Sequence, residues 1–173
     1  MKTILFIALT VLLFVVSAQA DDAININGYG KAIWGMSEDE VLKAEQGRVI
    51  KFDKPAKYLN STAPIGIDEI NVGTDKFKVY YLFDDKSRKL EQVNLAGLEE
   101  NNELINARTF TTILKLLTEK YGPPTFIKAN SNASWKLSRT LINLTHQYIR
   151  QMMTQVVISY KPLQSSIDNS KDL

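Results

Sequence analysis

The side chains that could do chemistry are few and widely separated. The chain has one histidine, His146, and no cysteine. A thiol nucleophile, a disulfide framework and a cysteine- or histidine-rich metal site within one chain are therefore excluded. His146 lies in an alternating apolar run, on the parity of Ile142, Leu144 and Tyr148. No nucleophile motif accompanies it, so we expect a structural or surface role for this histidine and not a catalytic one.

Two acidic pairs, Asp68-Glu69 and Asp84-Asp85, are the remaining candidates for acid–base catalysis. Asp84-Asp85 falls in a predicted turn, where carboxylates are usually solvated, and the spaced oxygens of a calcium loop are missing. The sequence contains no G-x-S-x-G, H-E-x-x-H, P-loop or Rossmann glycine pattern. Gly28-Tyr29-Gly30 precedes no βαβ unit and is interpreted as a bend. We therefore expect a protein that is not an enzyme and that holds no cofactor and no metal.

Length and composition are typical of an ordinary globular chain. The chain has 173 residues, of which 45% are hydrophobic and 23% are charged, and its net charge is +2. These values exclude a collagen-like, low-complexity or multi-pass membrane chain. No long basic run is present, so nucleic acid is not indicated as a partner.

The first twenty residues have the pattern of an export signal. Lys2 is followed by an apolar run over residues 4–16 and then by Ser17-Ala18-Gln19-Ala20, a small-x-small cleavage pattern. The run is shorter than the roughly 20 apolar residues of a membrane-spanning helix. We expect a signal peptide at 1–20 whose removal leaves a periplasmic or secreted protein with no membrane anchor. An uncleaved anchor is the alternative.

Two helices are predicted from capping and periodicity. Ser37 and Glu40 form a capping box that begins a helix over about 38–46, which Gly47 ends. The second helix begins after Asn101 or Asn102 and carries apolar residues at i, i+3, i+4 and i+7 spacing. Gly122 and the two prolines that follow it end this helix near residue 121.

Alternating patterns predict strands in both halves of the chain. Residues 48–52 predict a brief extended segment that Pro55 ends, and strands are expected at 65–72, 77–83 and 90–95. The second half predicts strands at 125–129, 135–137, 141–148 and 154–161. The strongest is 77–83, where alternation places Phe77, Val79, Tyr81 and Phe83 on one face.

The element order predicts an α+β fold. We expect two tandem units, each one helix plus about three strands, that form one antiparallel sheet with the helices packed on one face. Unit one covers about 28–97 and unit two about 101–162, within a single domain at 21–162. The polar tail, 163–173, is expected to be disordered.

Three segments carry a resemblance to a known family. They are Trp34-Gly35-Met36-Ser37 leading into Glu40-Val41, the aromatic strand 77–83, and Lys120-Tyr121-Gly122-Pro123-Pro124 followed by Trp135. Together they resemble the β-lactamase-inhibitor-protein-like group of small exported bacterial proteins, whose tandem helix–strand units also occur in BamE-like outer-membrane lipoproteins. The resemblance covers about 28–162 and implies the fold. It implies neither membrane tethering, because no lipidated cysteine exists here, nor inhibition of β-lactamase, because no matching contact residues are present.

The second face of the sheet is the candidate binding surface. If Phe77 and Tyr81 face the helices, the intervening residues point the other way. The side chains expected on this open face are Lys78, Tyr80, Leu82, Gln92, Asn94, Asn143, Thr145, Val157 and Ser159. Such a mixture of aromatic, aliphatic and amide groups is typical of a protein-binding surface, although antiparallel sheets also leave one face in water.

We therefore predict a non-enzymatic periplasmic module of protein-binding or inhibitor type. Another envelope protein would be its partner, held through the open sheet face. The alternative is a carrier of a small apolar ligand in a pocket between the sheet and the helices. The sequence does not indicate an oligomeric state.

Overall fold

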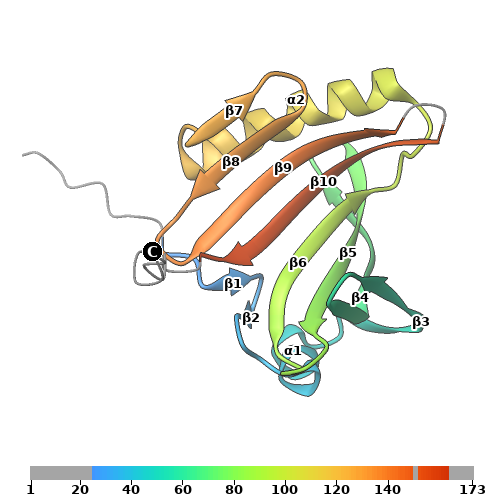
Figure 1. Cartoon of the computed structure of the whole chain (residues 1–173), viewed down its shortest axis with the longest axis vertical. Helices are drawn as coiled ribbons and strands as arrows, with labels where there is room; N and C mark the ends of the chain where they lie inside the picture. Colours follow the sequence, from blue (N-terminus) through green and yellow to red (C-terminus); the bar gives the residue numbers. More distant parts are fainter. Residues whose placement is uncertain (1–24, 150–151, 164–173) are drawn as a thin grey trace, which may run out of the picture.

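A computed structural model describes residues 25–149 and 152–163 of the chain (Figure 1). The predicted signal peptide at 1–20 and residues 164–173 of the predicted tail lie outside the described residues.

Ten strands and two helices make up the described chain. The helices are α1 (Glu38–Glu45) and α2 (Glu103–Tyr121). The strands are β1 (Gly28–Tyr29), β2 (Ala32–Ile33), β3 (Ile50–Tyr58), β4 (Ser61–Val72), β5 (Asp75–Asp84), β6 (Leu90–Gly97), β7 (Phe126–Lys128), β8 (Asn132–Lys136), β9 (Thr140–Ile149) and β10 (Met153–Pro162).

Eight of these strands form one antiparallel sheet. Their order is β3-β4-β5-β6-β10-β9-β8-β7, and β1 with β2 forms a separate hairpin. Sequential strands pair within β3–β6 and within β7–β10, so each half is a meander with short connections (Figure 1). The two meanders join where β6 pairs with β10, with Leu95 opposite Ile158 and Val93 opposite Tyr160.

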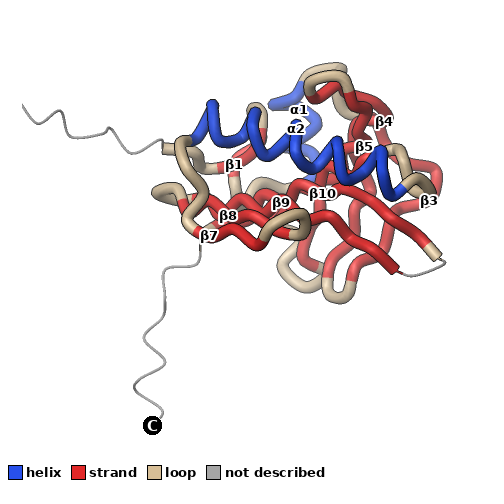
Figure 2. The backbone as a smooth tube through the Cα atoms, turned by 90° about the horizontal axis from the view of Figure 1, so that it is seen from above, coloured by secondary structure: helices blue, strands red, loops and turns tan. Residues whose placement is uncertain are grey.

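Both helices lie on the same side of the sheet (Figure 2). The N-terminus of α2 is capped by the Asn102 side chain, which accepts a hydrogen bond from the Ile105 N–H (3.1 Å), and Gly122 ends the helix. Phe110, Ile113 and Leu117 form its buried stripe against β9 and β10. This is the amphipathic pattern that the sequence predicts.

The core lies between the helices and one face of the sheet. Phe77, Val79, Tyr81 and Phe83 are all at most 2% exposed, whereas Tyr80 is half-buried on the opposite face. Strand alternation therefore identified the core face of β5 correctly.

The expected division into two units of one helix and three strands is wrong. The chain is mostly β, with an eight-stranded sheet and a separate two-stranded hairpin. The two helices also pack differently, because α2 contacts β9 and β10 whereas α1 contacts β2. The antiparallel sheet accompanied by helices is correct as a coarse description.

Two strands of the first half are longer than the sequence predicts, and each of them contains a proline. Strand β3 runs through Pro55, which is tolerated because β3 is an edge strand and its register shifts between Lys51 and Ala56. Strand β4 runs through Pro64 at a similar register shift between Thr62 and Ile65. A proline at a bulge or an edge does not end a strand, although the sequence pattern alone suggests that it does.

Within residues 25–149 and 152–163, neither helix combines the length and the hydropathy that a bilayer span requires.

Replacing Phe110 with alanine should cost far more stability than removing the α1 cap. Phe110 is 1% exposed, and Phe110→Ala is expected to lower the free energy of unfolding by about 3–5 kcal/mol. Ser37→Ala removes half of an exposed capping box and should cost about 1 kcal/mol. Urea denaturation measures both losses, with Thr111→Ala on the exposed face of α2 as the control. Equal small losses for Phe110→Ala and Thr111→Ala would contradict the packing of α2 on the sheet.

Candidate functional site

The sheet register brings the nine predicted residues onto one face, which we call the open face. One row of paired residues crosses all eight strands: Ile50, Gly66, Tyr80, Asn94, Ser159, Asn143, Ser134 and Phe126. A neighbouring row contains Lys78, Val157 and Thr145, and on the other side Leu82 pairs with Gln92. Residues predicted from four separate strands are therefore adjacent.

The polar side chains in the middle of the open face hydrogen-bond to one another. Asn94 Oδ1 accepts hydrogen bonds from Gln92 Nε2 (2.6 Å) and from Ser159 Oγ (2.7 Å). The Ser134 hydroxyl donates to Asn143 Oδ1 (2.7 Å). Asn94 and Leu82 are only 6% and 1% exposed, so these two residues support the face and do not offer contact area. The result is a pre-ordered polar floor.

An aromatic cluster stands on this floor at the β3–β5 end. The Tyr80 ring lies between Phe52 and Tyr58, with centroid separations of 5.6 and 6.3 Å. The Phe52 ring sits over Gly66, where an added Cβ would collide with that ring and with the Val79 carbonyl. The glycine therefore provides the space in which Phe52 packs beside Tyr80.

Lys78 borders the aromatic cluster. Its ammonium lies 4.5 Å from the centroid of the Phe52 ring, a cation–π contact, and 2.7 Å from Asp68 Oδ1. A hollow of about 410 Å³ opens between these groups and Tyr80. The sequence prediction included Phe52 in the brief segment 48–52 but did not place it on the open face, and it missed Tyr58 because it ended that segment at Pro55. The alternation of Ile50 and Phe52 was the signal that could have placed Phe52 on this face.

The other end of the open face is basic. Between Glu119 and Asp168 the sequence has no acidic residue but six lysines and arginines. Strand parity places Lys128, Lys136 and Lys161 on the open face, all are exposed, and none forms an ion pair among the described residues. Net charge and a search for basic runs both miss this asymmetry, since the six cations are widely spaced.

The candidate acid–base residues are each engaged elsewhere. Asp84 accepts hydrogen bonds from the N–H groups of Ser87 (2.6 Å) and Lys86 (3.2 Å), and these bonds lower its pKa. Hydrogen bonds from the Thr62 hydroxyl and the Lys57 ammonium lower the pKa of Asp85. Carboxylates with a lowered pKa stay ionised at neutral pH and are poor general acids.

The remaining candidates are also in structural settings. Glu69 pairs with Lys76 at 2.8 Å. His146 Nε2 lies 2.9 Å from the Thr154 hydroxyl, and its ring centroid is 6.4 Å from that of Phe110. Across the part of the chain that the structure describes, no three histidine or acidic side chains cluster to hold a metal.

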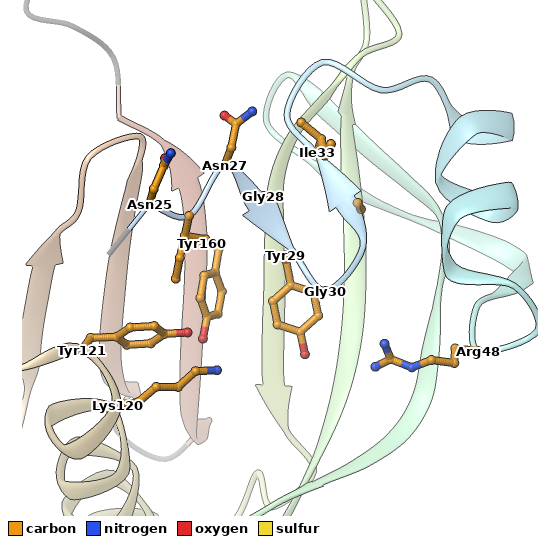
Figure 3. A pocket seen from close by; sticks show the side chains of 12 residues that line it. Asn25, Asn27, Gly28, Tyr29, Gly30, Ile33, Arg48, Lys120, Tyr121 and Tyr160 are labelled. Atoms are coloured by element: carbon orange, nitrogen blue, oxygen red, sulfur yellow. The ribbon is translucent and has the colours of Figure 1, made fainter. Parts of the chain in front are cut away.

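A second hollow, about 490 Å³ in volume, lies between the β1–β2 hairpin, the C-terminal end of α2 and β10 (Figure 3). We call it the tyrosine pocket, after Tyr29, Tyr121 and Tyr160 in its lining. The rings of Tyr29 and Tyr160 are 5.1 Å apart, and the Tyr121 ring is directed at Tyr160 (Figure 3). Burial raises the pKa of Tyr29 to about 12 and raises that of Tyr160 well above its ordinary value. The phenols therefore stay protonated at physiological pH.

A buried carboxylate beneath this pocket holds the hairpin to α1. Glu45 accepts hydrogen bonds from the Lys31 N–H (2.8 Å) and from Arg48 Nη1 (2.9 Å), and its side chain is 0% exposed. The Tyr81 hydroxyl lies buried nearby. Its pKa is raised, mainly by burial and to a smaller extent by the negative charge of Glu45. A buried charge must be compensated to be tolerated, and these two donors compensate it.

The chain matches no family model, no curated protein and no solved structure. Membership of the β-lactamase-inhibitor-protein-like group therefore stays a prediction.

Alkaline pH should destabilise the protein between about pH 10 and pH 12. Unfolded tyrosines release their protons near pH 10, whereas folded Tyr29 keeps its proton to about pH 12. A raised pKa in the folded state contributes stability that is fully present below pH 10 and is lost as the pH rises through 12. Urea unfolding at successive pH values measures the loss, and Tyr29→Phe should reduce it. Unchanged stability up to pH 12 would contradict the buried setting of these phenols.

Proposed function

We propose that the chain is a non-enzymatic protein-binding module, exported with removal of residues 1–20, that docks an envelope protein through its open face. One observation carries this proposal. Both helices lie on the other side of the sheet (Figure 2), and the register aligns one aromatic and polar row across all eight strands on the side that they leave uncovered.

Tyr80 is the proposed anchor. A large aromatic side chain offers wide contact area at low entropic cost. Tyr80 is already oriented by Phe52 and Tyr58, so little further conformational entropy is lost when a partner covers it. The hydrogen-bonded floor of Asn94, Gln92 and Ser159 supports the same rigid presentation.

The charges on the open face favour an acidic partner surface. Lys128, Lys136 and Lys161 are exposed, and strands β7–β10 contain no acidic residue. Complementary carboxylates on a partner would be steered toward this half of the sheet. The few cations are spread over separate strands and mixed with amides and an aromatic end, which suits a folded protein surface better than a polyanion.

The alternative function, a carrier of a small apolar ligand between sheet and helices, receives less support. The tyrosine pocket has the right position and size, but phenol, amide and cationic groups line it. A fully apolar ligand would leave these polar groups without partners.

Site-specific cross-linking tests which face is used. A benzophenone side chain placed at Thr145 or Val157 should yield protein adducts in cells, whereas the same group at Thr111 or Lys115, on the exposed face of α2, should not. Charge reversal by Lys136→Glu with Lys161→Glu should abolish the adducts, and Lys43→Glu on α1 is the matched control. Equal adducts from both faces, or adducts with anionic lipid in place of protein, would overturn the proposal.

Tyr80→Ala should separate binding from folding. With the cross-linked partner purified, this change is expected to weaken the complex by at least about 1 kcal/mol. The loss of folding stability should be well below that of Phe110→Ala, because Tyr80 is half-buried and Phe110 fully buried. Titration calorimetry and urea denaturation measure the two effects. If Tyr80→Ala leaves the affinity of the complex unchanged, Tyr80 is not part of the interface.

A further inference from the structure

The tyrosine pocket is separate from the open face and serves no purpose in the proposed docking. Its lining comes from four parts of the chain that meet only in the folded protein: the β1–β2 hairpin with the residues before it, Arg48 after α1, the end of α2, and β10. A volume of about 490 Å³ is within the range of small-molecule sites.

The walls of the pocket are aromatic. Tyr29 and Tyr160 pack with their ring centroids 5.1 Å apart, and Tyr121 and Tyr160 are only 9% and 6% exposed. Figure 3 shows the hydroxyls of Tyr29 and Tyr160 turned toward the same side of the hollow, with the Tyr121 ring directed at Tyr160. Ring faces of this kind suit a planar group, and the neutral hydroxyls can donate hydrogen bonds.

Two cations complete the lining, and no acidic residue belongs to it. Lys120 extends from the last turn of α2 with its ammonium 5.0 Å from the centroid of the Tyr121 ring, and it makes no ion pair within the described residues. Arg48 lies on the opposite side of Tyr29 (Figure 3). Glu45 engages Arg48 Nη1, but half of the Arg48 side chain is exposed, so donors remain for a ligand.

We infer that the tyrosine pocket binds a small organic anion, a planar molecule that carries a carboxylate or a phosphate group. The anionic group is held by Lys120 with the phenol hydroxyls, and the planar body lies against the tyrosine rings. Hydrogen bonds from a cation to an anion are stronger than neutral ones. Arg48 is paired with Glu45, so Lys120, which makes no ion pair within the described residues, supplies the uncompensated positive charge of the site.

Titration calorimetry of the full chain with four probes tests this inference. Benzoate and phenyl phosphate should bind at millimolar concentrations or below, and benzamide, which is similar in shape but neutral, should bind at least about tenfold more weakly. Tighter binding of phenyl phosphate than of benzoate assigns a phosphate ester, and the reverse assigns a carboxylate. Inorganic phosphate, which lacks the planar body, should also bind more weakly than phenyl phosphate.

Single substitutions in the lining of the tyrosine pocket, each with a matched control, locate the binding. Lys120→Gln should weaken benzoate or phenyl phosphate about tenfold, while Lys115→Gln on the same helix leaves the affinity unchanged. Tyr160→Phe keeps the ring and should weaken binding severalfold, with Tyr80→Phe on the open face as its control.

Four results would overturn the inference: no binding of either anion at millimolar concentration, equal affinity for benzamide, equal affinity for inorganic phosphate, or an unchanged affinity in Lys120→Gln. None of these readouts involves the open face, so they are independent of the proposed protein binding.

Discussion

The pairing of β6 with β10 is the interaction on which the rest of the structure depends. Each meander alone would be a four-stranded sheet with two unpaired edges. The free backbone N–H and C=O groups of such an edge can pair with another chain and cause aggregation. Pairing Leu95 with Ile158 and Asn94 with Ser159 removes one edge from each half. The same register aligns apolar residues under the helices and polar residues on the open face, since alternate residues point to opposite sides.

The helices and the hairpin occupy one side of the sheet only, and this asymmetry produces both candidate sites. On the uncovered side, aromatic side chains reduce their exposure to solvent by packing against one another, as Tyr80 does between Phe52 and Tyr58. On the covered side, the short hairpin cannot fill the space beside α2, and the tyrosine pocket remains. Glu45 then fixes the hairpin by accepting hydrogen bonds from Lys31 and Arg48.

The local charge at the two sites is more positive than the net charge of the chain suggests. Net charge is close to balanced, yet every charge between Glu119 and Asp168 is positive. This stretch supplies both Lys120 in the pocket and the lysines of β7, β8 and β10 on the open face. A protein can therefore be nearly neutral overall and still present an anion-attracting region, because electrostatic steering depends on local charge.

The sequence by itself determined the features that depend on short-range physics. Capping residues and the apolar stripe located α1 and α2 correctly, and alternation in β5 separated Tyr80 from the buried Tyr81. Alternation also assigned nine residues to one face. What only the tertiary structure decided was the length of β3 and β4, since Pro55 and Pro64 are accommodated at an edge and at bulges that no local pattern reveals. It alone brought Tyr29, Lys120 and Tyr160 around one pocket, because contacts between residues so far apart in the chain depend on the packing of whole elements.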